Sequence, residues 1–121
     1  MPLMLSLLAV TASCVPVAQP AKTDVATTRS FFAAINANDQ AVLGTMVKAG
    51  SRYLSPSQQI DFDLVETLGM IGERGAQLKL IDATPASEKD SVTIRTQIAG
   101  QPEQVGTVKL EGGCVTGLVQ P

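Results

Sequence analysis

The spacing of apolar residues changes once along this chain, at Gly75, and that change limits the folds available to it. From about residue 24 to Gly75, apolar residues recur every three or four positions, which predicts amphipathic helices. After Gly75 they alternate with polar residues, most regularly in 91–98, which predicts strands with one buried face. Helices followed by strands indicate one α+β domain, in which helices cover one face of a curved antiparallel meander sheet.

The first two helices are expected within residues 23–50. The first begins near Thr23 or Asp24 and runs to about Ala37, and it carries two of the chain's 3 Phe residues side by side. Asp39 caps a short second helix, which ends at Ala49-Gly50. Its expected buried residues are Val42, Leu43, Met46 and Val47.

A brief strand is expected at 51–54, followed by a third helix. Ser55 and Pro56 have the residue types of a helix cap and a first helical position, and Gln58 completes a capping box. The helix then extends to about Arg74. Asp61 and Asp63 are two positions apart, so on a helix they point in different directions and form no carboxylate pair. The expected apolar stripe is Ile60, Leu64, Leu68 and Ile71, flanked by Val65.

Four strands are expected after Gly75. The pair Gly112-Gly113 between the last two is a strong signal for a tight hairpin turn. Arg95 alternates away from the apolar positions of its strand, so its side chain is expected in solvent. The strands are expected at Gln77–Asp82, Ser91–Ile98, Gln104–Glu111 and Cys114–Val119.

The N-terminus has the pattern of an export signal. Met1–Val10 is apolar and uncharged but too short to span a bilayer, which takes about 20 residues. Small residues precede Cys14, as in the lipobox of bacterial lipoproteins, which this segment resembles. The resemblance implies a signal peptide at 1–13, a lipid anchor on Cys14 and a tether at 14–23, on the periplasmic or outer face of a bacterial membrane. A buried first helix is the alternative.

The two cysteines have two possible fates. Cys14 and Cys114 form an even pair, which in an oxidising compartment permits a disulfide from the N-terminus to the last strand. A lipidated Cys14 cannot make that bond. Lipidation is preferred, with Cys114 left as a lone structural thiol, and the disulfide stays open as the alternative.

Composition removes several classes of function. Aromatic residues make up only 3% of the chain, the formal net charge is -2, and the basic residues are scattered, so nucleic-acid binding is not expected. The chain has 0 His, which removes the commonest general base and metal ligand. Two Cys residues without His make no zinc site, so neither a metal nor a cofactor is expected.

Two segments resemble the NTF2-like superfamily in its SnoaL-like branch. Residues 31–43, Phe-Phe-Ala-Ala-Ile-Asn-Ala-Asn-Asp-Gln-Ala-Val-Leu, are similar to its opening helix and aspartate-led second helix, and 108–119 to its closing hairpin. The resemblance spans roughly 24–121, with the cystatin-like arrangement as second choice. It implies a cone-shaped sheet closed by three N-terminal helices around a cavity. Such domains serve as isomerases, epoxide hydrolases, dehydratases, ligand binders or dimerising adaptors.

Arg52, Tyr53 and Asp61 are the polar residues best placed to reach the mouth of such a cavity. Because no carboxylate pair or His accompanies them, we expect an exported, membrane-tethered, non-catalytic domain that binds a small apolar ligand or a protein partner. The alternative is a SnoaL-like lyase, isomerase or hydrolase that uses Asp61 and Tyr53. A homodimer formed through the sheet is a third possibility.

Overall fold

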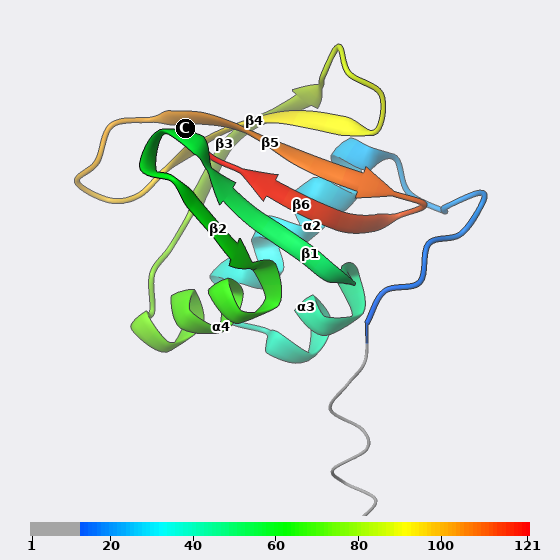
Figure 1. Ribbon diagram of the computed structural model, residues 1–121, viewed down its shortest axis with the longest axis horizontal. Coiled ribbons are helices and arrows are strands. Elements are labelled where there is room, and N and C mark those ends of the chain that lie inside the picture. Colours follow the sequence, from blue (N-terminus) through cyan, green and yellow to red (C-terminus); the bar gives the residue numbers. More distant parts are fainter. Residues whose placement is uncertain (1–12) are drawn as a thin grey trace, which may run out of the picture.

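The computed structural model describes residues 13–121 as three α-helices, one 3₁₀ turn and a six-stranded sheet in the order β2-β1-β6-β5-β4-β3 (Figure 1). Within these residues, no helix has the length and apolar character needed to cross a membrane. The helices are α2 (Asp24–Asn36), α3 (Gln40–Met46) and α4 (Leu64–Arg74), and the 3₁₀ turn is η2 (Pro56–Gln58). The strands are β1 (Val47–Ser55), β2 (Ile60–Asp63), β3 (Lys79–Pro85), β4 (Ser91–Gln97), β5 (Gln104–Glu111) and β6 (Cys114–Val119).

The sheet is mixed, whereas an antiparallel meander was expected. Strands β3 to β6 do form an antiparallel meander, and Gly112 and Gly113 both have positive φ in its last turn. The hairpin of β1 and β2 adds to it through β1, which pairs with β6 in parallel. The expected sheet lacked this pairing, since it joins segments on either side of the meander.

Helix α2 forms as the sequence predicts and packs behind the sheet in Figure 1. The Thr23 hydroxyl accepts a hydrogen bond from Ala26 N at 3.1 Å, and the Asp39 carboxylate caps α3 by accepting from Val42 N at 3.2 Å. Phe31 and Phe32 are fully buried, with their rings edge to face and centroids 5.6 Å apart.

The inner face of the sheet, which the helices cover, is filled by side chains at its centre. Val92 and Ile94 of β4, Val108 of β5 and Leu118 of β6 are all at most 1% exposed in one cluster with the two Phe rings. The central cavity implied by the resemblance is therefore occupied by an apolar core.

Helix α3 ends at Met46, earlier than expected, and Val47 already belongs to β1. Val47 is buried as expected, but Val42 is 41% exposed. The strand expected at 51–54 is longer because β1 pairs with both β2 and β6.

The third helix begins at Leu64 rather than near Ser55. Pro56 starts only a 3₁₀ turn, which ends where Gln59 adopts a left-handed conformation with φ 55. Instead of capping a helix, the Ser55 hydroxyl donates to the main-chain oxygen of Pro121 at 2.7 Å. Asp63 caps α4 by accepting from Glu66 N at 3.0 Å. The residues Ile-Asp-Phe-Asp of β2 alternate apolar and polar side chains, but they were included in the third helix that the sequence predicted.

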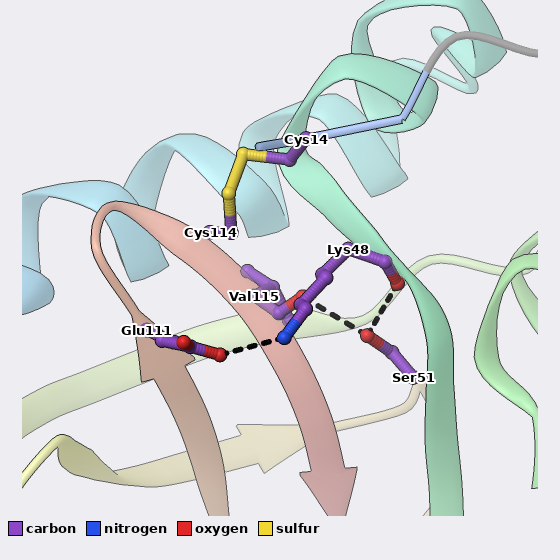
Figure 2. A network of polar contacts seen from close by, with 6 residues as sticks. All are labelled: Cys14, Lys48, Ser51, Glu111, Cys114 and Val115. Carbon is purple, nitrogen blue, oxygen red and sulfur yellow. Dashed lines mark hydrogen bonds and ion pairs between the residues drawn. A yellow bond between two sulfur atoms is a disulfide. The ribbon is translucent and has the colours of Figure 1, made fainter. Parts of the chain in front are cut away.

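A disulfide joins Cys14 to Cys114, with an S–S distance of 1.98 Å (Figure 2). Cys114 is thus not the lone thiol that was expected, and Cys14 in this bond has no thiol left for acylation. Residues expected to form a tether are fastened to the domain here, since Cys14 N donates to Val47 O and Val17 N to Gly112 O, both at 3.0 Å. The expected signal peptide lies, apart from Ser13, outside the described residues.

Polar contacts beside the disulfide hold β1 to the β5–β6 hairpin (Figure 2). Lys48 pairs with Glu111 at 2.9 Å, and the Ser51 hydroxyl lies 2.6 Å from Lys48 O and 3.2 Å from Val115 O. These contacts lie where the pairing of β1 with β6 shifts register between Val47 and Arg52. They stabilise an irregular stretch that regular ladder bonds do not hold.

Removal of the disulfide in Cys14→Ala/Cys114→Ala should lower the free energy of unfolding by about 2–4 kcal/mol, since the bond closes a long loop in the unfolded chain. Chemical denaturation with and without reductant provides the measurement. The wild type in reductant should match the double variant. Equal midpoints for all samples, or two thiols trapped by iodoacetamide in the unreduced protein, would contradict the bond.

Candidate functional site

Arg52 and Asp61 lie on the outer face of the sheet, opposite to the face that carries the core. Their strands pair so that Arg52 lies opposite Asp63 and Leu54 opposite Asp61, which places these four side chains on one face. Arg52 Nε donates to Asp61 Oδ1 at 2.8 Å, and the Asp61 side chain is 66% exposed. The pair lines an open groove of about 530 Å³ beside β2 and α4. Arg52 and Asp61 therefore form a solvated ion pair at the edge of the sheet.

Tyr53 projects from the same strand to the inner face and packs against the core. Burial raises the pKa of its hydroxyl above the ordinary value of 10.0, which moves ionisation of the phenol still further from neutral pH. Since Tyr53 and Asp61 point to opposite faces, the structure does not assemble them into a catalytic pair. Asp61 and Asp63 share a strand face, contrary to the helical expectation, but Asp61 bonds Arg52 and Asp63 caps α4.

A groove of about 460 Å³ lies between α3, α4 and the start of β1, and we name it the helix groove. Apolar side chains from all three elements form its walls, and small residues widen it. A hollow of this size and lining is typical of sites for small apolar molecules. Its lining residues are Ser13, Gln40, Leu43, Gly44, Val47, Ala49, Gly50, Asp63, Val65 and Leu68.

The walls of the helix groove are joined by contacts around Gly72. Asn38, with φ 51, turns the chain between α2 and α3, and its side chain lies directly against Gly72 of α4. Gln40 Nε2 donates to Asn38 Oδ1 at 2.7 Å and to Leu68 O at 3.3 Å. A Cβ at Gly72 would collide with the Asn38 side chain. The glycine therefore permits the close approach of α4 to the α2–α3 corner.

The chemistry available in the helix groove is apolar contact. Asp63 is its one ionisable lining residue, and that carboxylate already accepts a hydrogen bond from the first turn of α4. Within residues 13–121, no cluster of three or more His, Cys, Asp or Glu side chains could hold a metal ion. The arrangement can bind an apolar molecule but places no acid and base beside it.

The sequence had marked Leu43, Val47 and Leu68 as core residues, and all three are buried. Val65 was noted only as a flank of the α4 stripe, yet its side chain is 48% exposed and lines the helix groove. The available signal in the sequence for this role was the position of Val65, a large apolar residue at the border of the buried stripe. The groove itself depends on how α3 and α4 pack, which their separate patterns do not contain.

No protein-family model matches this chain, and no curated protein sequence matches it significantly. Solved structures do match its fold. A cystatin-fold protein of Novosphingobium aromaticivorans has a TM-score of 0.67 at 14% identity, over 84% of this chain and 99% of its own. An NTF2-like protein of unknown function from Cytophaga hutchinsonii has a TM-score of 0.66 at 15% identity, over 85% and 90%.

A third match is a protein of Catenulispora acidiphila with a ketosteroid isomerase-like fold, solved with trimethylamine. Its TM-score is 0.56 at 18% identity, over 85% of this chain and 86% of its own. At these identities the likeness concerns the fold alone. The chain has the α+β fold shared by NTF2-like, cystatin-fold and ketosteroid isomerase-like proteins.

Proposed function

We propose that this chain is an exported, non-catalytic domain that binds a small apolar ligand in the helix groove. The observation that supports this most is the groove itself, because its volume of about 460 Å³ and its apolar walls suit a small molecule. Val65 supplies exposed apolar contact area, and the buried Leu43 and Leu68 form the apolar floor beneath it.

The arrangement of the polar residues favours binding over catalysis. Acid–base chemistry needs a titratable group within reach of the reacting atoms. Tyr53 packs against the core with its pKa raised by burial, and Asp61 is bonded to Arg52 on the other face of the sheet. The enzymatic alternative based on these two residues has no support in their geometry.

The disulfide supports export. Structural disulfides persist in oxidising compartments such as the bacterial periplasm and are rare in the cytosol of most organisms. The apolar sequence of Met1–Val10 has the character of an export signal. We therefore assign the mature domain to the periplasm or the outer face of a bacterial membrane, with Cys14 bonded to Cys114.

Self-association through the outer face is a second candidate, favoured by an uncharged row across the sheet. The residues of this row lie directly opposite one another on neighbouring strands, and Val105 next to the row is 56% exposed. Charges at its margin are paired: Lys109 with Glu88 at 2.6 Å and Arg95 with Glu103 at 3.1 Å. An uncharged centre with a charged rim suits an interface. The row is Leu54, Val119, Thr107, Thr93 and Thr84.

Binding in the helix groove is tested with the neutral apolar dye N-phenyl-1-naphthylamine, whose fluorescence rises in an apolar site. The wild type should show saturable binding of one dye. Val65→Trp should weaken that affinity about tenfold, or about 1.4 kcal/mol, because the indole fills part of the groove.

The matched control is Met70→Trp, on the same helix at 47% exposure but outside the groove lining, which should bind the dye like the wild type. The proposal fails if the wild type binds no dye, or if both Trp variants lose affinity equally.

The raised pKa of Tyr53 is tested by the ultraviolet absorbance of its phenolate, since it is the chain's single Tyr. The folded protein should titrate at a higher pH than the protein in urea, because burial disfavours the charged form. With the folded pKa raised, stability is fully present below the unfolded pKa near 10.0 and is lost as the pH rises through the folded pKa. Tyr53→Phe should lose this alkaline component, whereas identical titration curves in both states would disprove the shift.

Dimerisation through the outer face predicts a light-scattering mass of twice the 12.6 kDa chain, less any cleaved signal. Thr107→Arg should give the monomer mass, because it buries an unpaired charge at the centre of the interface. Thr45→Arg, on exposed α3, should remain dimeric. A monomeric wild type at all accessible concentrations removes this second candidate.

A further inference from the structure

A small pocket lies on the inner face at the end of the sheet where the β4–β5 loop meets the C-terminus, and we name it the end pocket. Its volume is about 120 Å³. Apolar and uncharged polar side chains both line it, and it shares no lining residue with the helix groove. Its lining includes Leu78, Thr96, Ile98, Pro102, Gln104 and Gln120.

Gln120 contributes a buried acceptor without a donor. The residue is 8% exposed, and its side-chain Oε1 has no hydrogen-bond partner. The main chain is fixed on both sides, because Gln120 N donates to Leu54 O at 2.8 Å and Pro121 O accepts from Ser55 Oγ at 2.7 Å. Leaving a buried carbonyl unpaired costs about 1–3 kcal/mol. A molecule that donates to this oxygen recovers that free energy.

Gly106 of β5 makes the space in which the Gln120 side chain lies. A Cβ on Gly106 would be 2.6 Å from Gln120 Oε1 and 2.5 Å from Val119 O, both too close. The glycine is inside a strand, where its missing side chain weakens the sheet unless another group approaches closely. Here the approaching group is the Gln120 carboxamide, so the lack of a side chain at Gly106 allows the buried acceptor to lie against β5.

The lining restricts the chemistry of an occupant. Thr96, Gln104 and Gln120 are polar but uncharged, so an ion would lose its water without gaining an opposite charge. Leu78, Ile98 and Pro102 favour a partly apolar group. The volume equals that of about four waters in the liquid, which fits a group of roughly four non-hydrogen atoms.

We propose that the end pocket binds a small uncharged group with an N–H or O–H donor, such as a primary carboxamide or a hydroxyl, which donates to Gln120 Oε1. The group is a small molecule or one end of a larger one. This site is separate from the helix groove, so it stands or falls independently of the function proposed there.

Acetamide and acetone test the proposal, because the two molecules have nearly the same shape and only acetamide has a donor. Each is titrated into ¹⁵N-labelled protein while the amide signals of Leu78, Thr96 and Gln120 are followed by NMR. Acetamide should shift these signals saturably, and acetone should bind about tenfold more weakly, since it leaves Oε1 unpaired.

Gln120→Met removes the acceptor at similar volume and should erase the preference for acetamide over acetone. Gln104→Met is the matched control in the same pocket and should keep it. Equal binding of both probes by the wild type overturns the proposal, as does the absence of any shift, which would mean that water alone fills the pocket. These two outcomes come from the wild type, so they do not depend on whether a variant folds.

Discussion

The parallel pairing of β1 with β6 is the interaction on which the rest of the structure depends. β6 lies in the interior of the sheet, with the meander on one side and the β1–β2 hairpin on the other. Parallel neighbours cannot be joined by a tight turn, and here residues 56–113, with β2, α4 and strands β3 to β5, lie between them in sequence. Because α3 leads into β1 and α4 follows β2, this pairing also sets where both walls of the helix groove stand against the sheet.

The two ends of β6 carry different features. At its start, Cys114 is disulfide-bonded to Cys14 of the N-terminal segment. The Lys48–Glu111 ion pair next to it links β1 to the end of β5 (Figure 2). Beyond its end, Gln120 lines the end pocket. The strand between them contributes Val115 and Leu118 to the core. The disulfide can therefore stabilise the fold without contact with the end pocket.

Local patterns predicted the elements that local interactions determine. The bounds of β5 and β6 and the turn at Gly112-Gly113 follow from alternation and glycine conformation, and α2 follows from its cap and its Phe residues. The start of α4 did not follow, because Ser55-Pro56 is an equally good signal for a single 3₁₀ turn. The pairing of β2 with β1, which is a tertiary contact, keeps residues 60–63 in a strand and delays the start of α4 to Leu64.

The candidate sites depended even more on tertiary contacts. Arg52, Tyr53 and Asp61 were predicted together as the polar residues best placed to reach a cavity mouth, yet strand alternation places Tyr53 on the face opposite the other two. The unpaired state of the Gln120 carbonyl is invisible in the sequence, since any terminal glutamine could find water. Gly106 was the one local hint, as a glycine inside a strand that needs no positive φ.

The core explains why the centre of the domain formed by residues 13–121 contains neither a hollow nor a charged group. Phe31 and Phe32 pack edge to face in the buried cluster on the inner face, to which Ile94 and Leu118 also belong. An ionisable group placed there would lose its hydration without a partner, and burial already raises the pKa of Tyr53 at the border. Of the hollows beside this core, the helix groove and the end pocket offer mainly apolar contact and neutral hydrogen bonds.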